Sequence, residues 1–327
     1  MSARLLEVRD LRTHFLNRGT VAKAVDGVSF HVDAGEMLAL VGESGCGKSV
    51  TAYSLLRLIA DPPGKIVGGE ILFEGRDLMK LSDDEMRRLR GDRIAMIFQD
   101  PMSSLNPVFT IGAQIAESVL VHRGGTKAAA LSRAVELLDL VGIPDSRRRI
   151  DEYPHRLSGG MRQRAVIAMA LACEPKLLIA DEPTTALDVT IQAQVLALIS
   201  ELKQRLGMGV IMITHDLGVV AQHAQRVAVM YAGKIVEQAA VADLFSRPLH
   251  PYTNGLLASI PRQGASGGRL NEIPGMVPSL LAMPRGCSFA PRCPKAVDRC
   301  THDVPSLADI SPLHPVSCFV AQQEAKL

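Results

Sequence analysis

The sequence contains no tryptophan, and aromatic residues make up only 4% of it. Proteins that bind single-stranded nucleic acid stack the bases on aromatic side chains, so we expect no surface of that kind. The net charge of +2 on 327 residues also lacks the basic excess that is typical of nucleic-acid-binding proteins. We therefore expect no nucleic-acid partner.

Long hydrophobic runs are also missing. No segment approaches the roughly 18 consecutive apolar residues that span a bilayer, and the longest apolar stretches, such as residues 210–213 and 227–232, have the length of strands. The first residues do not combine a basic stretch with an apolar one, so we expect no secretory signal. These absences favour a cytosolic protein that reaches a membrane only through a partner.

One stretch has the pattern of a phosphate-binding loop. Residues 37–41 are apolar and predict a buried strand, residues 42–49 read GESGCGKS, and a helical pattern follows. The octet fits G-x-x-x-x-G-K-[ST] at every fixed position. Glycine allows the turn that points backbone N–H groups at phosphate oxygens, and the helix start adds its positive dipole end. The flanking strand and helix favour this reading over a glycine-rich turn with a chance lysine.

The sequence therefore predicts a site for a nucleoside triphosphate. Lys48 is expected to reach the terminal phosphates and the Ser49 hydroxyl to ligate Mg²⁺. The residues that we expect to line the site are Gly42, Ser44, Gly45, Cys46, Gly47, Lys48, Ser49 and Val50.

Apolar periodicity predicts an α/β fold for most of the chain. Residues 5–35 and 69–78 alternate apolar and polar side chains, which indicates antiparallel strands. Farther on, strands alternate with helices, which favours a largely parallel sheet covered by helices. The expected strands are 94–98, 177–180, 210–214 and 227–231, and the expected helices are 83–90, 111–141 with a break at Gly124-Gly125, 159–173 and 190–206.

The texture of the sequence changes near residue 245. Residues 246–318 are rich in Pro and Gly, show little periodicity and contain four of the six cysteines. We place a domain boundary there, with a nucleotide-binding domain over 1–245 and a small, loop-rich extension over 246–327.

Two further motifs follow the phosphate-binding loop. Asp181 and Glu182 end an apolar strand, and in a P-loop ATPase such a pair supplies a carboxylate on the Mg²⁺ side and one that polarises the attacking water. The pair alone is weak evidence, because acidic residues are common at strand ends. Ser158, Gly159 and Gly160 open a long helix, where backbone N–H groups suit a phosphate.

Along the chain, the phosphate-binding loop comes first, the helix start at Ser158 second and the Asp181-Glu182 pair third, and motifs in this order resemble the ATP-binding-cassette (ABC) family over residues 5–245. The resemblance implies a RecA-like core with an antiparallel β subdomain and a helical subdomain at about 101–165. It also implies that Ser158, Gly159 and Gly160 act in trans on ATP held by an opposite subunit. The other roles implied by the family pattern are Phe15 against adenine, Gln99 as a sensor of Mg²⁺ and of the attacking water, Asp188 in the loop that communicates across the dimer, and His215 at the γ-phosphate.

The implied catalytic set is Lys48, Gln99, Glu182 and His215, and the implied Mg²⁺ set is Ser49, Gln99 and Asp181. A structural role is the alternative for His215 and, with more weight, for Phe15. Cys46 and Met161 depart from the commonest family spelling. Neither side chain needs to touch phosphate, although Cys46 introduces an oxidisable group.

Flanking residues narrow the resemblance. The segments 98–107 (FQDPMSSLNP), 161–164 (MRQR) and 250–253 (HPYT) are similar to those in ATPase subunits of bacterial oligopeptide and dipeptide importers, with the D-type subunit of dipeptide permeases as the most similar pattern. The resemblance implies ATP hydrolysis that powers import of di- and oligopeptides across the inner membrane. It implies a peripheral protein on the cytoplasmic side, with a distinct F-type ATPase, two membrane permeases and a periplasmic peptide-binding protein as partners. The permeases are expected to dock on residues 100–107 and the helices over 111–141.

Other functions remain open at this point. ATPase subunits of nickel, glutathione or murein-peptide importers share nearly all of these motifs. A soluble, non-transport ABC ATPase would normally show two cassettes in tandem or a long coiled-coil insertion, and neither is visible. A nucleotide-binding module without turnover would be expected to lack Glu182 or His215.

Four cysteines, Cys287, Cys293, Cys300 and Cys318, cluster in the extension. A disulfide is disfavoured in a cytosolic chain, and unrelated buried cysteines are the minority reading. A metal site could hold together a segment with a small core. Structural zinc usually has tightly spaced cysteine pairs, so the wide gaps favour an iron–sulfur cluster, with zinc as the runner-up. The importer resemblance also implies a [4Fe–4S] cluster, for which we expect a structural role.

Overall fold

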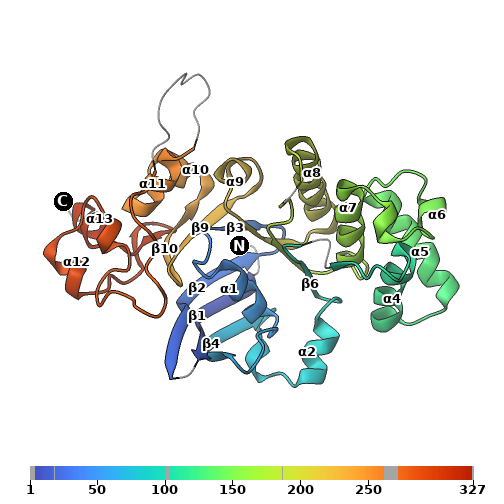
Figure 1. The fold of residues 1–327 in the computed structure, drawn as a ribbon, viewed down its shortest axis with the longest axis horizontal. Coiled ribbons are helices and arrows are strands. Elements are labelled where there is room, and N and C mark those ends of the chain that lie inside the picture. The colour runs from blue at the N-terminus through green and yellow to red at the C-terminus, as the bar shows by residue number, and fades with distance from the viewer. Residues whose placement is uncertain (1–3, 18, 101–103, 186, 261–271, 326–327) are drawn as a thin grey trace. The chain divides into compact units, whose positions relative to one another are not determined.

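The computed structural model describes residues 4–17, 19–100, 104–185, 187–260 and 272–325 (Figure 1). The chain forms two compact units, each of which is described here by itself. The first unit is built mainly from Leu78–Ile213, and the second from Leu6–His31, Met37–Asp77 and Thr214–Leu327. Within the described ranges, no helix combines the length and the apolar character needed to cross a membrane.

Three parallel strands form the centre of the first unit. They are β6 (Ile94–Ile97), β7 (Leu177–Asp181) and β8 (Gly209–Thr214), with Ile94 opposite Leu177 and Leu177 opposite Gly209. Nearly every residue of these strands is buried. A strand that is covered on both faces has apolar residues at nearly every position. This explains why these strands appear in the sequence as continuous apolar runs and not as alternating apolar and polar residues.

The longer helices of the first unit lie where the sequence predicts helices, and three short ones, at residues 78–80, 146–149 and 154–156, were not predicted. Thr110 and Thr126 cap α4 and α5 with their hydroxyls, and Gly124 and Gly125 separate the two helices at positive φ, which confirms the predicted break. Helices α4, α5 and α7 pack on one another, and α7 also packs on β6 and α8. The elements are η1 (Leu78–Lys80), α2 (Asp83–Leu89), α4 (Ile111–Arg123), α5 (Lys127–Leu140), α6 (Ser146–Arg149), η2 (Pro154–Arg156), α7 (Gly159–Ala170) and α8 (Val189–Leu206).

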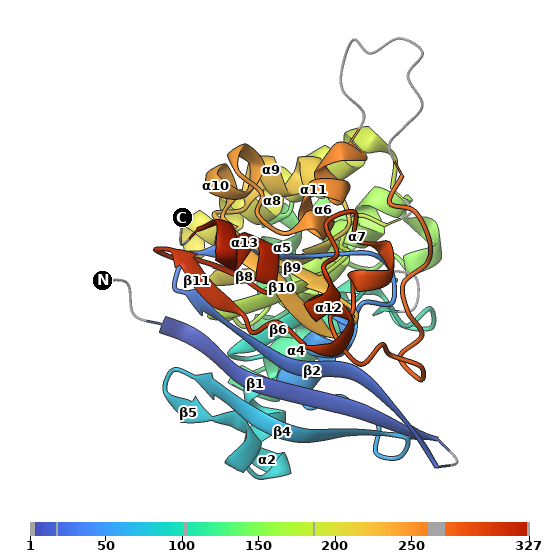
Figure 2. The same ribbon diagram turned by 90° about the vertical axis from the view of Figure 1, so that its left-hand side faces the viewer.

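An antiparallel sheet lies in the second unit, and Figure 2 shows its long strands side by side. Its order is β2 (Thr20–Asp33), β1 (Arg4–Asn17), β4 (Gly64–Phe73) and β5 (Arg76–Asp77). The predicted antiparallel strands at the N-terminus are therefore confirmed. The register of β1 on β4 shifts beside Arg12, close to Gly69 at φ 95°, where a side chain would collide with the backbone of Leu11.

The second sheet region of this unit has the order β11 (Ala308–Ser311), β12 (His314–Val316), β10 (Lys234–Ala240), β9 (Arg226–Tyr231) and β3 (Met37–Val41). Strands β3 and β9 are parallel, whereas β9, β10, β12 and β11 pair antiparallel. The prediction of a largely parallel sheet holds for the first unit and for β3 on β9, and the strands beyond β9 add an antiparallel edge. Sequence periodicity did not predict β11 and β12, because both strands are short.

The segment beyond residue 245 shares a hydrophobic core with β9. The rings of Tyr252 and Phe289 pack on Tyr231, with centroids 4.7 and 5.2 Å away. The boundary at residue 245 stays a prediction. The other elements of the second unit are α1 (Lys48–Leu55), α9 (Leu217–His223), α10 (Val241–Ser246), α11 (Pro251–Ala258), η3 (Ala290–Arg292), α12 (Asp298–His302) and α13 (Phe319–Glu324).

Candidate nucleotide site

The phosphate-binding loop joins β3 to α1, as the sequence predicts. Gly42 has φ 153° and Gly47 has φ 106°. A side chain on Gly42 would collide with the carbonyl oxygen of Met230, and one on Gly47 with that of Ala24. Only glycine fits at these two positions, because both the dihedral angle and the space exclude a Cβ atom. The loop is thereby pressed against β9 and β2.

Lys48 is buried within this loop. Its Nζ atom donates hydrogen bonds to the carbonyl oxygens of Gly42 at 2.8 Å and of Glu43 at 3.1 Å. The loop itself therefore holds the ammonium in place. Ser44 and Gly45 are exposed at the tip of the loop, and Ser49 and Val50 are half-buried. This arrangement has the features of a cradle for an anionic group.

Cys46 points away from solvent. Its side chain is fully buried, and its Sγ atom lies 3.8 Å from Lys48 Nζ. Burial raises the pKa of the Cys46 thiol, and the nearby Lys48 ammonium offsets only part of that effect. A protonated, buried thiol is a poor nucleophile, so the structure does not favour the oxidisable site considered from the sequence.

Phe15 lies on β1 directly opposite Gly64 of β4. Its ring covers that glycine, since a Cβ atom on Gly64 would come within 2.8 Å of the Phe15 ring. The side chain is half-buried. This contact gives Phe15 a packing role, and its proposed contact with adenine stays a prediction.

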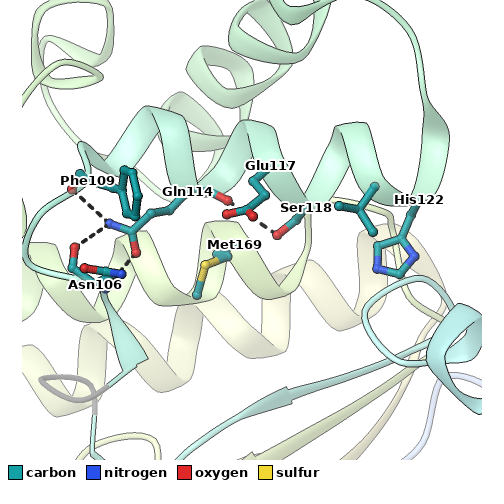
Figure 3. A pocket seen from close by; sticks show the side chains of 8 residues that line it. Asn106, Phe109, Gln114, Glu117, Ser118, His122 and Met169 are labelled. Carbon is teal, nitrogen blue, oxygen red and sulfur yellow. Dashed lines mark hydrogen bonds between the residues drawn. The ribbon is translucent and has the colours of Figure 1, made fainter.

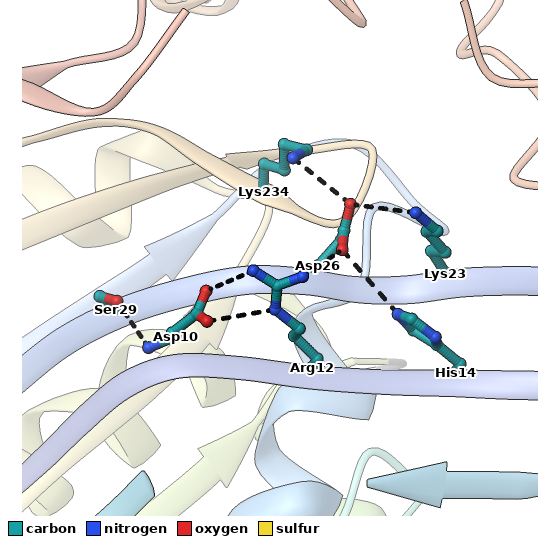
Figure 4. A network of polar contacts seen from close by, with 7 residues as sticks. All are labelled: Asp10, Arg12, His14, Lys23, Asp26, Ser29 and Lys234. Carbon is teal, nitrogen blue, oxygen red and sulfur yellow. Dashed lines mark hydrogen bonds and ion pairs between the residues drawn. The ribbon is translucent and has the colours of Figure 1, made fainter. Parts of the chain in front are cut away.

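Asp26 ties the β1–β2 region to the turn between β9 and β10 (Figure 4). Its carboxylate lies 3.4 Å from Lys234 Nζ and 3.9 Å from His14 Nε2, and its backbone N–H donates to the Gly233 carbonyl at 2.9 Å. Burial alone would raise the pKa of Asp26, but Lys234 and Lys23 hold it below its ordinary value. The charged network therefore fixes the strand that carries Ala24, against which Gly47 packs.

The first unit brings together two of the predicted catalytic residues. Gln99 follows β6 and Glu182 follows β7, and the Gln99 Nε2 atom donates to Glu182 Oε2 at 3.1 Å. Thr185 Oγ1 also donates to this oxygen, at 3.0 Å. Asp181, the last residue of β7, is fully buried. The parallel strands place these groups at their carboxyl ends, which is the usual ligand-binding edge of an open α/β sheet.

Glu182 has the left-handed backbone angle φ 45°, which is uncommon for a residue with a side chain. Its N–H donates to the Ile213 carbonyl at 3.0 Å, so the neighbouring strand holds the turn. Backbone strain of this kind clusters at functional sites. The Thr185 hydroxyl contact was not predicted, and no sequence pattern pointed to it.

Ser158 and Asp188 both serve as helix caps in the first unit. The Ser158 hydroxyl accepts the Met161 N–H at 3.4 Å at the start of α7, and Asp188 Oδ1 accepts the Ile191 N–H at 2.9 Å at the start of α8. Both side chains are exposed. The Ser158 hydroxyl keeps its own hydrogen for donation outward. Gly160 packs close to Ile191, where a Cβ atom would come within 2.8 Å.

The structure distributes the predicted residues between the two units. The phosphate-binding loop, Phe15 and His215 belong to the second unit, and Gln99, Glu182 and the Ser158 helix start belong to the first. His215 is exposed after β8, between Thr214 and Asp216, and the Asp216 carboxylate caps α9.

A groove crosses the helical part of the first unit (Figure 3). It has a volume of about 400 Å³ and lies between the loop before α4, α4 itself and Met169 of α7. Gln114 anchors the loop, because it donates to the Asn106 and Phe109 carbonyls at 3.0 Å and accepts the Asn106 N–H at 2.8 Å. Phe109 and Val121 expose 53% and 70% of their surface here. Of the docking face expected over 100–107, residues 101–103 lie outside the described ranges.

The four tail cysteines are neighbours but do not converge. Cys287 N–H donates to the Cys300 carbonyl at 2.8 Å. Burial is the first cause that raises the pKa of Cys293, and the charges of Cys318, Cys287 and Cys300 raise it further. Across the described ranges, however, no group of three or more His, Cys, Asp or Glu side chains is arranged to hold a metal ion. The expected metal-binding extension is thus not supported.

The sequence reading missed a set of contacts on the phosphate-binding loop itself. Arg292 and Tyr252, both beyond residue 245, bond to Glu43 of the loop. No local pattern indicates such contacts, because the partners lie more than two hundred residues apart.

Comparisons with known proteins agree with this geometry. Residues 25–185 match the ABC transporter family, and residues 236–300 match the C-terminal region of oligopeptide/dipeptide transporters. The chain is 60% identical over 324 residues to the probable peptide ABC transporter ATP-binding protein y4tR of Sinorhizobium fredii, and the alignment covers 99% of this chain and 97% of that protein.

Two further relatives and one structure extend this comparison. The chain is 53% identical to the oligopeptide transport ATP-binding protein AppD of Bacillus subtilis, with 98% of each chain covered. It is 52% identical to the dipeptide transport ATP-binding protein DppD of the same species, with 99% of this chain and 96% of that protein covered. The dimeric structure of the ATP-binding cassette MJ0796 with ADP and phosphate matches at a TM-score of 0.65 and 26% identity, over 72% of this chain and 98% of that chain.

The fold and the site define an ABC-type ATPase. Within that class, the chain belongs to the family of ABC transporter ATP-binding proteins whose relatives are named for the transport of peptides, dipeptides and oligopeptides.

Proposed function

We propose that this protein hydrolyses ATP to power the import of di- and oligopeptides through partner permeases. The observation that carries the proposal is the Glu182 carboxylate, which follows the buried Asp181 and is held by Gln99 at 3.1 Å. A carboxylate in this place can accept the proton of an attacking water. The peptide cargo is supported by the match of residues 236–300 and by the names of the relatives.

The residues present fit a nucleotide with its metal ion. Gly42 and Gly47, at φ 153° and 106°, allow the turn that points backbone N–H groups of the loop at a phosphate. Ser49 and Asp181 each offer a side-chain oxygen of the kind that Mg²⁺ prefers. Mg²⁺ supplies positive charge that neutralises the triphosphate when it is bound. Lys48 adds a second positive charge beside the loop.

The chain's own groups account for the hydrolytic step. The water oxygen forms a bond to the γ-phosphorus while the bond to the bridging β–γ oxygen breaks, and ADP and phosphate leave. Glu182 accepts the water proton, and Gln99 orients the Glu182 carboxylate for that task. Lys48 and His215 stabilise the charge that develops on the γ-phosphate oxygens. Phe15 would pack on the adenine ring.

The complete site would need a second cassette. The Ser158 helix start is exposed in the first unit, and its hydroxyl, with Gly159 and Gly160, would donate to the γ-phosphate of an ATP held by the opposite subunit. The opposite subunit would be a distinct ATPase, with Asp188 near the contact between the two. The isolated chain should then hydrolyse ATP poorly, at a rate that rises with protein concentration. Fast turnover by a demonstrated monomer, independent of concentration, would contradict a composite site.

The groove beside α4 would receive the cytoplasmic loops of two membrane permeases. Phe109 and Val121 line it with exposed apolar side chains, and the Gln114 hydrogen bonds preorganise the loop at its edge. The protein would then lie on the cytoplasmic side of the inner membrane, and a periplasmic peptide-binding protein would deliver the cargo. Cross-links from residue 121 to the permeases would support this placement, and cross-links confined to residues 20–35 would contradict it.

A [4Fe–4S] cluster at the four cysteines is a separate proposal. Burial, and then the neighbouring cysteines, raise the pKa of the Cys287, Cys293 and Cys318 thiols, but within the described ranges the four side chains do not form a metal-binding group. Iron and acid-labile sulfide in protein purified without oxygen would support the cluster. Stoichiometric zinc in colourless protein would decide for zinc instead.

The decisive test of cargo is ATP hydrolysis by the complex with its permeases, supplied with the loaded binding protein. Dipeptides and oligopeptides should stimulate hydrolysis. Stimulation by nickel or glutathione, with none by peptides, would assign a different importer.

A further inference from the structure

A buried arginine of the C-terminal segment is bonded to the phosphate-binding loop. The Arg292 side chain is 4% exposed, and its Nη1 and Nη2 atoms donate to Glu43 Oε2 at 2.7 Å and Oε1 at 3.0 Å. Glu43 is the second residue of the loop and lies 249 positions earlier in the chain. Two parallel N–H···O bonds of this kind fix direction as well as distance.

Arg292 is itself held firmly from the other side. Its Nε atom donates to the Pro274 carbonyl at 2.9 Å, and Nη2 also donates to the Ile273 carbonyl at 3.2 Å. Nη1 lies 3.4 Å from the Tyr231 hydroxyl. The backbone around residue 274 therefore fixes the guanidinium in one place. If Glu43 moved, the guanidinium could not move with it, as a long exposed side chain would.

A second contact from the same part of the chain reaches the backbone of Glu43. The Tyr252 hydroxyl accepts the Glu43 N–H at 2.9 Å, and the Tyr252 ring is fully buried against Tyr231 and Phe289. On its remaining side, Glu43 accepts a hydrogen bond from Lys48 Nζ through its carbonyl oxygen. The residue that the C-terminal segment holds is thus one of the two whose carbonyl oxygens hold Lys48.

We propose that Arg292 and Tyr252 form a brace, here called the tail brace, that sets the conformation of the phosphate-binding loop and thereby the affinity for ATP. A loop that is aligned before binding loses less conformational freedom when the phosphates arrive. Without the brace, ATP binding would have to order both the loop and Lys48. Arg292 and Glu43 do not reach the reacting atoms and are positioning residues. The inference rests on the proposed function in one respect, that this loop binds ATP.

The test is a titration of the full-length chain with a fluorescent MgATP analogue, together with KM and kcat for ATP in the assembled complex. Arg292→Ala should weaken binding and raise KM roughly tenfold, which corresponds to about 1.4 kcal/mol, with kcat within about twofold of the wild type. Arg292→Lys keeps the positive charge but cannot donate two parallel hydrogen bonds to the Glu43 carboxylate, so its KM for ATP should lie between those of the wild type and Arg292→Ala. Arg285→Ala, which removes an exposed arginine of the same segment, is the matched control and should change nothing.

Glu43→Gln tests the same interaction from the side of the phosphate-binding loop. The change preserves the size of the side chain and weakens the pair, so it should raise KM a few-fold. Combined with Arg292→Ala it should add little, because both changes remove one interaction. If Arg292→Ala does not fold, the titration of Glu43→Gln decides.

An unchanged affinity in either variant would overturn the tail brace. The tail brace would also be overturned if a variant lowered only kcat, in proportion to the fraction of protein that is folded, because a purely structural role gives that result. Failure of the proposed function looks different: the wild-type complex would then show no ATP turnover at all, whereas the titration of the full-length chain would still report on the brace.

Discussion

Two glutamates of this protein have opposite surroundings. Glu237, in β10, is fully buried, and its carboxylate accepts the N–H groups of Leu249 and His250 at 2.8 and 2.9 Å. His314 Nε2 lies 2.8 Å from Oε1. Burial alone would raise the pKa of Glu237, but these partners, with His314 first among them, hold it below its ordinary value.

Glu182 is half-buried, and the side chains of Gln99 and Thr185 donate hydrogen bonds to its carboxylate. Side-chain partners can rotate away, whereas the backbone partners of Glu237 move only if the fold moves. The accessible carboxylate of Glu182 is therefore suited to proton transfer, and the buried carboxylate of Glu237 is suited to holding the C-terminal segment on β10. The two roles should therefore separate when each residue is changed.

The largest effect is expected from Glu182→Gln. The amide keeps the size of the side chain but cannot accept a proton, so ATP hydrolysis should fall by about 10²–10⁴-fold while ATP binding persists. The free energy of unfolding should change by less than about 0.5 kcal/mol. The measurement is steady-state ATPase activity of the assembled complex, with the equivalent residue of the partner cassette also changed so that its site does not mask the loss. Retention of most activity would remove Glu182 from the catalytic set.

Glu237→Ala should do the reverse. It leaves His314 and two backbone N–H groups buried without their acceptor, and the loss of one partner of a buried pair costs about 3–5 kcal/mol. Thermal or urea unfolding should show this loss, with kcat per folded molecule unchanged below the transition. Glu324→Ala, at an exposed glutamate of the same segment, is the control and should be near neutral.

The phosphate-binding loop illustrates what the sequence can predict. Its strand, its glycine positions and its helix are contiguous, so one short pattern specifies the backbone and the ligand class together. The family resemblance implied a role for Gln99 and a role for Glu182, but it did not predict that the two side chains are in contact. That their side chains touch depends on the pairing of β6 with β7, which the sequence does not state.

The C-terminal segment illustrates what the sequence cannot predict. Glu237 reads as one polar residue in a strand, and its burial arises because Val316 pairs opposite it. The link from Arg292 to Glu43 likewise depends on packing between distant segments. Periodicity reports the face of one element and not its partner in the fold. The cysteine spacing predicted a metal site, yet spacing along the chain does not fix convergence in space.

Acid should lower the stability of the protein through the buried side chain of His250. Burial lowers the pKa of His250 from 6.5 to about 4. Between these values the unfolded chain binds a proton that the folded chain does not, so stability should fall as the pH drops from about 6.5 to about 4, by up to about 3 kcal/mol. Urea unfolding against pH measures this. His250→Asn retains a helix cap for α11 without a titrating group, so its pH dependence should be flatter; an identical slope would contradict the assignment.

The smallest expected effect concerns the orientation of Glu182. Gln99→Ala removes the hydrogen bond to the carboxylate but leaves the proton acceptor in place, so kcat should fall by about tenfold, equivalent to about 1.4 kcal/mol. Thr185→Val removes the other side-chain hydrogen bond and is the matched comparison. An effect of Gln99→Ala as large as that of Glu182→Gln would mean that Gln99 takes part in the chemistry directly.

ATP-driven uptake of a labelled dipeptide, measured in vesicles that contain the complete transporter, tests the central claim most directly. The wild-type complex should accumulate the peptide only when ATP is supplied on the side that carries this subunit. Glu182→Gln in both cassettes should abolish uptake, whereas Arg285→Ala should leave it intact. Peptide accumulation at the wild-type rate by the Glu182→Gln complex would contradict the account.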